Sequence, residues 1–297
     1  MGNFHLNRIG VALDLTSKDQ ETLQYAGYLA GLFMPETLIA LHIVPVWDIG
    51  DFFKVDIRNP FMPAAPALGK VYETLSEEMT TYAKYPEEKM KIDIQEGRPY
   101  QKLKQMVEKD QIELLILGQK TSSSGSGITS RRLARHIKND LLFVPSIDRL
   151  PIRKILWAVD FSEHAYHAFS IAHQLREVIP EKEKIIGLHI IDIPPFQQYG
   201  ERGTYEYAIS SLPAAAKRRC ENFMVKHQIN QEEVDMSIHL SAGRNVAEDI
   251  LTHAQKMEAD IIFIGAVGHS GLENYFLGSV TESLLTQNDQ IPIWVVR

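Results

Sequence analysis

Short apolar stretches alternate with helical patterns along the whole chain. Runs of this length without polar interruption are typical of strands buried on both faces of a parallel sheet. Between them, apolar residues recur with helical spacing, as they do over residues 23–34. The pattern therefore predicts an α/β protein with right-handed crossovers and helices on both faces of each sheet. The predicted strands are residues 9–13, 38–44, 114–117, 141–144, 155–159, 188–190, 261–264 and 293–296.

The order of these elements repeats within the chain. Asp14 and Asp160, which each follow a predicted strand, lie 146 positions apart, and Gly118 and Gly265 lie 147 apart. An offset this constant across strands, helices and turns indicates the duplication of one β/α unit. We predict an N-terminal domain over residues 1–147 and a C-terminal domain over 151–297, joined by a Pro-flanked linker.

Less regular segments lie in the middle of the first half. Residues 45–68 are rich in Pro, Asp and aromatic residues, and they predict an irregular excursion. A charged helix is expected over residues 69–83 and a strand near 92–94. Pro99 follows a Gly-Arg turn in a position that suits the first turn of a helix, which we expect to continue to residue 109.

Composition narrows the class of protein. The 297 residues fit two domains of about 150 residues each, and the net charge of −7 argues against a nucleic-acid surface. Cys220 is the only cysteine, so no disulfide can form within the chain. No apolar run approaches the ~18 residues of a membrane span, and the N-terminus lacks the apolar region of a signal peptide. We expect a soluble cytoplasmic protein that binds neither membrane nor nucleic acid.

The stretch over residues 260–281 carries the clearest chemical signal. Its apolar run ends at Gly265, Gly268 follows, and Gly278-Ser279 opens a helical pattern nine residues later. Glycine lets backbone N–H groups approach an anion without a Cβ in the way. A helix N-terminus adds unpaired N–H groups and the positive end of its dipole. Strand, glycine loop and helix together predict a phosphate-binding corner.

Two common phosphate-binding motifs do not account for this corner. A Walker A loop ends in Gly-Lys followed by Ser or Thr, and no lysine lies between Gly265 and Thr281. A Rossmann fingerprint has the spacing G-x-G-x-x-G after the first strand of its unit, whereas here the glycines follow a later strand with a wider spacing. Neither of these motifs fits the stretch over residues 260–281.

The spacing Gly265-x2-Gly268-x9-Gly278-Ser279 resembles the G-2x-G-9x-G-[S/T] loop of nucleotide-binding universal stress proteins. Residues 155–163, 188–190, 278–282 and 292–296 also resemble segments of that family. The resemblance implies two tandem, doubly wound, five-stranded parallel sheets of the Rossmann-like nucleotide hydrolase class, with the first and fourth strands adjacent. It also implies pairing between the last strands, 141–144 with 293–296, as an intramolecular pseudo-dimer.

By the same resemblance the C-terminal domain would bind ATP, with Mg²⁺ on the phosphates. Asp160 would contact the adenosine, although capping of the helix near Ser162 is its alternative role. Ile190 would meet the adenine through its main chain. His269 can reach the phosphates or stay an exposed loop histidine. The implied cofactor-binding residues, with no catalytic residue and no protein metal ligand among them, are Val159, Asp160, Ile190, Gly265, Gly268, His269, Gly278, Ser279, Val280 and Thr281.

The first half departs from this motif. Thr121 stands at the second glycine position, and only five residues separate it from Gly127, the third glycine. Ile128 then stands where the second half has Ser279. A loop four residues shorter cannot follow the same path around a triphosphate, so we expect this site to be lost or altered. Backbone N–H groups with Lys120 or Arg131 could instead hold a smaller anion.

Several other polar residues have structural interpretations. His42 and His189 occupy the same place in the repeated second strand, but one histidine per copy offers no zinc ligand set, so we expect hydrogen-bonded strand histidines. Asn245 and Glu248 have the spacing of a helix capping box. Cys220 lies in a helical pattern without a catalytic neighbour and is expected to be inert.

Three functions are compatible with these patterns. The first is a tandem universal stress protein whose C-terminal domain binds ATP and whose surface then changes for an unknown protein partner. The second is an adaptor that works without nucleotide. The third is a slow ATPase or self-phosphorylating protein with Ser270, Ser279 or Thr281 as acceptor, against which stands the lack of an arginine finger, a Walker lysine or a base in the motif. A homodimer of the whole chain stays open.

Overall fold

The computed structural model describes residues 6–45, 65–119, 128–146, 149–193, 202–241, 245–268 and 277–297. The chain divides into two compact units, Met1–Asp148 and Arg149–Arg297. The expected excursion over residues 46–64 lies outside the described residues, as do the loop residues 120–127 and 269–276.

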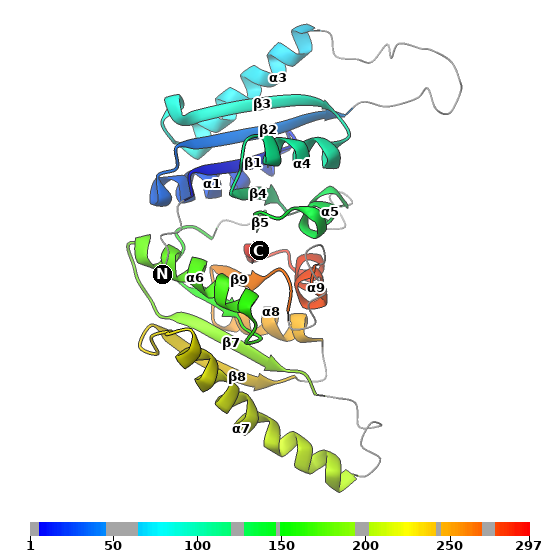
Figure 1. Cartoon of the computed structure of the whole chain (residues 1–297). Coiled ribbons are helices and arrows are strands. Elements are labelled where there is room, and N and C mark those ends of the chain that lie inside the picture. Colours follow the sequence, from blue (N-terminus) through cyan, green and yellow to red (C-terminus); the bar gives the residue numbers. More distant parts are fainter. Residues whose placement is uncertain are drawn as a thin grey trace, which may run out of the picture. The chain divides into compact units, whose positions relative to one another are not determined.

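The first unit is built on a parallel sheet with the strand order β3-β2-β1-β4-β5 (Figure 1). All of its strands were predicted, although the one expected near residues 92–94 extends over eight residues. The order reverses between β1 and β4, which is where open α/β sheets place their ligand crevice. The strands are β1 (Arg8–Leu13), β2 (Thr37–Pro45), β3 (Met90–Gly97), β4 (Leu114–Gly118) and β5 (Asp140–Val144).

Helices cover both faces of this sheet. On one face α1 (Asp19–Phe33) packs beside α3 (Ala65–Glu78), and α4 (Pro99–Lys109) and α5 (Ile128–His136) pack on the other. Pro99 begins α4 as predicted. The helix expected over residues 69–83 is present, but its last five residues, Met79–Ala83, form a π-helix. There Gly27 of α1 packs so close that a Cβ on it would lie 1.8 Å from the Ala83 carbonyl oxygen.

The second unit repeats this arrangement with the strand order β10-β9-β6-β7-β8, again parallel throughout. Here α6 and α7 cover one face of the sheet and α8 and α9 the other (Figure 1). The strands are β6 (Ile155–Ala158), β7 (Ile185–Ile191), β8 (Val234–Leu240), β9 (Ile261–Gly265) and β10 (Ile293–Val296). The helices are α6 (Glu163–Val178), α7 (Arg202–Lys226), α8 (Val246–Lys256) and α9 (Ser279–Gln287).

Large aromatic side chains hold the second unit together. Trp157 and Trp294 are completely buried on β6 and β10, and Phe263 of β9 stacks on Trp294 with 5.1 Å between ring centroids. The indole nitrogen of Trp157 donates a hydrogen bond to the Ala165 carbonyl, which ties the first turn of α6 to the sheet. Burying one such side chain contributes roughly 2–3 kcal/mol, so this core fixes the strand ends that carry the polar residues.

The predicted fold class is confirmed in each unit. The continuous apolar runs are strands buried on both faces, and the first and fourth strands of each unit are neighbours, β1 with β4 and β6 with β9. Pairing between the two last strands stays a prediction. Among the helices of the described residues, none is both long enough and apolar enough to cross a membrane.

Candidate functional site

The candidate site lies at the carboxyl ends of β6 and β9. The two strands pair in parallel register, with Ala158 opposite Ile264. Asp160 and Gly265, which follow or end these strands, therefore lie at the same edge of the sheet. This is the adjacency that the sequence predicted from the first and fourth strands.

A cavity of about 370 Å³ opens at this edge. That volume falls within the range of small-molecule sites, roughly 300–1,000 Å³. Nine of the ten residues predicted to bind the nucleotide line this one cavity, and the tenth, His269, lies outside the described residues. The nine are Val159, Asp160, Ile190, Gly265, Gly268, Gly278, Ser279, Val280 and Thr281.

There is a steric reason for glycine at position 268. A Cβ added to Gly268 would lie 2.7 Å from Oδ2 of Asp160, closer than real side chains approach. The other carboxylate oxygen of Asp160 accepts a hydrogen bond of 3.0 Å from the Ser162 backbone N–H. The carboxylate is thus anchored by one oxygen, and the other oxygen faces the backbone of the glycine loop.

Gly265 and Gly278 bring three backbone segments close together. A Cβ on Gly265 would lie 2.9 Å from the His164 Cβ, so the first turn of α6 packs directly on the end of β9. The Gly278 N–H donates a 2.7 Å hydrogen bond to the Ala266 carbonyl. The buried Thr281 hydroxyl donates to the Gly265 carbonyl at 2.9 Å. These two hydrogen bonds hold the start of α9 beside the end of β9.

The N-terminus of α9 lies at the cavity. Gly278 is its N-cap residue, with an extended backbone and no side-chain cap. The N–H groups of the first helical turn have no partner within the helix, so among the described residues those of Ser279 to Thr281 can serve water or a ligand. The positive end of the helix dipole lies at the same point. Among the described residues, the cavity lining contains no lysine or arginine.

The remaining lining of the cavity is mostly apolar and was not predicted. Val246 and Ile250 come from α8, and Leu188 comes from β7. Their signal was weak, because single aliphatic residues on a helix or strand are ordinarily core residues. His189 also lines the cavity, and its Nδ1 lies 2.8 Å from the Val159 carbonyl oxygen, as expected for a hydrogen-bonded strand histidine. His42 makes the equivalent contact with Leu13 in the first unit, at 2.9 Å.

The start of α6 lies beside the cavity, and its residue Ala165 is part of the lining. Ser162 caps the helix by accepting a hydrogen bond from the Ala165 N–H. Phe161, with φ +64°, turns the chain directly after Asp160. Burial, together with the positive charge of His167, lowers the pKa of His164, so this histidine is neutral at neutral pH. Its Nδ1 is buried without a hydrogen-bond partner within the described part of the chain.

Two further predictions concern the cap of α8 and the environment of Cys220. The Asn245 side chain accepts a hydrogen bond from the Glu248 N–H at 2.9 Å and donates to the Glu248 carboxylate at 3.0 Å, which makes a cap at the start of α8. Cys220 is buried, and burial raises the pKa of its thiol, which makes the thiolate scarce.

The equivalent corner of the first unit is arranged differently. The carboxylate of Asp19, the first residue of α1, accepts the backbone N–H groups of Asp14 and Leu15 at 3.0 and 2.7 Å. Asp19 is only 4% exposed. Burial, and secondarily the charge of Asp14, raises its pKa to about 7. Asp14 itself accepts a hydrogen bond from the Thr16 hydroxyl.

Comparison with known proteins places both units. The universal stress protein family model matches residues 5–145 and again residues 151–297. The chain belongs to the universal stress protein family. Its two matched segments agree with the internal repeat found in the sequence, so each unit is a universal stress protein domain.

Individual proteins resemble this chain in sequence or in fold. A universal stress protein of Methanocaldococcus jannaschii is 31% identical over 136 residues, which cover 46% of this chain and 74% of that protein. The crystal structure of a universal stress protein from Archaeoglobus fulgidus is 17% identical with a TM-score of 0.68, and the match covers 99% of each chain. A protein of unknown function from Pseudomonas aeruginosa is 16% identical with a TM-score of 0.64, covering 98% of this chain and 92% of that one.

One solved relative carries a nucleotide. A universal stress protein has been crystallised in complex with cAMP; it is 16% identical, has a TM-score of 0.36, and is matched over 48% of this chain and 98% of its own.

Proposed function

We propose that the second unit binds an adenine nucleotide, with ATP and Mg²⁺ as the expected ligand, and that the chain acts as a stress-response regulator that reads this ligand. The observation that carries the proposal is the meeting of nine predicted residues around one cavity of about 370 Å³. The lining comes from six elements, β6, α6, β7, α8, β9 and α9, and from the loops that follow β6 and β9.

The chemistry of the lining suits a nucleotide. The apolar floor, to which Leu188, Val246 and Ile250 contribute, can take an adenine ring. Asp160 has one carboxylate oxygen directed toward the loop, where it can accept a ribose hydroxyl. The first-turn N–H groups of α9 can receive phosphate oxygens, as helix N-termini do in other phosphate sites.

Magnesium would come with the phosphates. Mg²⁺ keeps several waters and usually takes phosphate oxygens as its remaining ligands, so it needs no dedicated cage of side chains. Bound in this way it would neutralise part of the phosphate charge in a cavity whose described lining has no cationic side chain.

The regulatory part of the proposal follows from binding thermodynamics. A ligand that binds only the folded protein stabilises it by RT ln(1 + [L]/Kd), which is ~2.7 kcal/mol at a hundredfold excess over Kd. Only a difference in affinity between two forms of the protein can shift their populations. We therefore propose that the nucleotide binds one form of the second unit more tightly and so changes the surface that a protein partner meets at this site.

Thermal unfolding of the full chain tests binding. ATP, ADP, AMP and cAMP are each titrated with and without Mg²⁺, and native mass spectrometry of the freshly purified protein identifies any nucleotide that has co-purified. The proposal expects a rise in Tm that depends on ligand concentration. No shift with any of the four nucleotides would leave the adaptor function instead.

A matched pair of variants locates the site. Gly268→Ala adds a methyl group 2.7 Å from the Asp160 carboxylate. We therefore expect the variant to need at least about tenfold more nucleotide than the wild-type chain for the same rise in Tm. Gly31→Ala in α1, where an added Cβ meets nothing within 4 Å, is the control and should leave the shift unchanged. Equal responses from the two variants would place the nucleotide elsewhere.

Phosphate release and labelled-phosphate incorporation separate binding from catalysis. At equal protein concentration the binding function expects neither to exceed a protein-free blank. Turnover that is lost in Gly268→Ala would convert the proposal into an ATPase or a self-phosphorylating protein.

A further inference from the structure

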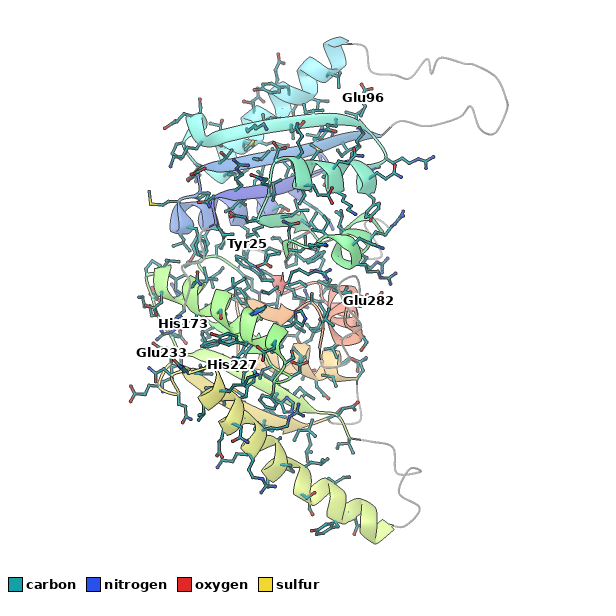
Figure 2. All side chains as sticks on the ribbon, viewed as in Figure 1. Tyr25, Glu96, His173, His227, Glu233 and Glu282 are labelled. Atoms are coloured by element: carbon teal, nitrogen blue, oxygen red, sulfur yellow. The ribbon has the colours of Figure 1, made fainter. Side chains whose placement is uncertain are left out.

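A second group of polar side chains lies at the other end of the second sheet, away from the nucleotide cavity. His173 and Glu177 lie on α6, and Glu233 lies directly before β8 (Figure 2). The Ile185 N–H donates to the Glu233 carbonyl, which places the group at the amino ends of β7 and β8. We call these three residues the α6–β8 cluster.

The α6–β8 cluster has the geometry of a ligand set. His173 and Glu177 are four positions apart, so they share one face of the helix. One ligand atom from each of the three residues lies within 4.8 Å of the others. Nε2 of His173 is 3.1 Å from Oε2 of Glu233, and the imidazole ring packs 5.7 Å from that of Phe169, which orients it. His173 and Glu233 are partly buried and Glu177 is exposed, so an ion can reach them.

Two cationic side chains already contact the carboxylates. Arg176 lies 2.8 Å from Glu177 and 3.7 Å from Glu233, and Lys182 lies 3.0 Å from the second oxygen of Glu177. The Lys182 and Glu177 side chains are 43% and 45% exposed, and ion pairs so open to solvent contribute little. Arg176 is 14% exposed and also donates to the Glu183 carbonyl, so it stays in place. Lys182 is the cation that an incoming metal ion would displace.

We propose that the α6–β8 cluster binds a divalent transition-metal ion of the Zn²⁺ class. One imidazole and two carboxylates suit Zn²⁺, Mn²⁺ or Co²⁺ better than the all-oxygen preference of Mg²⁺ or Ca²⁺. Three protein ligands leave at least one position to water, which makes the site open and exchangeable. The bound ion would tie the second half of α6 to the turn before β8.

The first unit provides an internal comparison. Its helix α1 occupies the place of α6, and beyond Glu21 it carries no histidine or acidic residue. The ligand set is therefore a property of the second unit and not a requirement of the duplicated fold.

Metal titration of the chelator-treated full chain, without nucleotide, tests the site. Zn²⁺ binding is followed by calorimetry and by Tm, and Co²⁺ binding by its visible absorption spectrum. We expect one ion per chain, a higher Tm, and a Co²⁺ spectrum typical of low coordination number. Because no nucleotide is present, failure here leaves the proposed function untouched, and failure of ATP binding leaves this site untouched.

Variants separate the cluster from adventitious binding, which must be controlled in a chain with 11 histidines. His173→Gln and Glu233→Gln should each weaken Zn²⁺ binding at least about tenfold. His253→Gln, which alters a histidine of α8 outside the cluster, should leave it unchanged. Zn²⁺ binding of equal strength in all three variants, or no binding to the wild-type chain, would overturn the proposal.

Removal of the competing cation gives a prediction of the opposite sign. Lys182→Ala frees one oxygen of Glu177 and should tighten Zn²⁺ binding about two- to fivefold. If the cluster is only an ion-pair network, the same variant leaves metal affinity unchanged. That outcome would also overturn the proposal.

Discussion

The corner between first strand and first helix is built differently in the two units. In the first unit, the Asp19 carboxylate folds back and takes the backbone N–H groups that end β1. In the second unit the connection is shorter, Ser162 caps the helix, and the Asp160 carboxylate lies against Gly268 at the cavity. The same arrangement of strands therefore carries two different corners. In the first unit an acidic side chain accepts the backbone N–H groups after the strand, whereas in the second unit a cavity opens there.

The comparison teaches where a duplicated fold can diverge. The turn after the strand is the same in both units, because Leu15 and Phe161 both have a positive φ, +59° and +64°. The strand histidines make the same hydrogen bond as well. Divergence is concentrated in the residues that follow, which determine whether polar groups at the strand ends are satisfied internally.

The largest expected effect concerns Asp19 and pH. Its pKa is about 7 in the folded chain, raised above the ordinary 3.8 of an aspartate by burial first and by the charges of Asp14 and Glu78 after it. Because the folded state holds this proton more tightly, its contribution to the unfolding free energy is fully present below pH ~4 and is lost as pH rises through about 7. The loss is on the order of a few kcal/mol.

Urea unfolding at acidic and slightly alkaline pH, read by hydrogen exchange in the first unit, measures this loss. Asp19→Asn should flatten the dependence on pH, whereas Ser162→Ala in the second unit should not. A wild-type first unit that gains stability between pH 5 and 8 would show that the carboxylate is ionised throughout, held by its two backbone donors.

The next effect compares the glycines that end the fourth strands. Gly265→Ala places a methyl group 2.9–3.1 Å from the Cβ and backbone of His164, which cannot move independently. Of the residues that the structure describes, a methyl group in Gly118→Ala would meet only the Thr22 hydroxyl, at 3.1 Å. We expect the first change to cost ~1–3 kcal/mol and the second clearly less. Denaturation of both variants measures this, and equal costs would contradict the close packing of α6 on β9.

Thr281→Val tests the closure of the glycine loop. Valine keeps the shape of threonine but removes the hydroxyl that donates to the buried Gly265 carbonyl. The expected cost is ~1–2 kcal/mol in the unfolding free energy. Tryptophan fluorescence is a suitable probe, because Trp157 and Trp294 are both buried in this unit. A neutral substitution would mean that the hydroxyl does not hold the start of α9.

The smallest expected effect comes from the helix caps. Ser162→Ala removes the side-chain oxygen that accepts the Ala165 N–H, at a cost of ~1 kcal/mol. At the N-cap position of α1, Lys18 makes no side-chain cap, so Lys18→Ala removes no capping bond and should cost less than Ser162→Ala. Thermal unfolding of both variants compares them, and a larger loss from Lys18→Ala would reverse the comparison.

Much of the architecture could be predicted from the sequence because the signals were periodic or repeated. Buried strands could be recognised as apolar runs. The duplication could be recognised because equivalent residues of the two halves, such as Asp14 and Asp160, are separated by a nearly constant number of positions. Glycines drew attention to the site because their joint spacing has few other physical uses. The Asn245 cap was readable for a similar reason, since its partner lies three residues away.

The unpredicted parts depend on distance or on packing. The apolar floor of the cavity could not be assigned, because Val246 and Ile250 look like any core positions of a helix. The fold-back of Asp19 left no pattern, since an acidic residue in the first turn of a helix is ordinarily solvated. The α6–β8 cluster needs Glu233, which lies 60 positions from His173 in the sequence and comes near it only in the folded chain.

The pair of bonds from Gly278 and Thr281 to the end of β9 has a consequence for how affinity can evolve. Because folding itself fixes the N-terminus of α9 beside the strand, the protein loses less conformational entropy when a ligand binds there. The residues between these anchors can then vary in sequence without displacing the helix end. If the proposed nucleotide binds here, its selectivity can change while this preorganised helix end is retained.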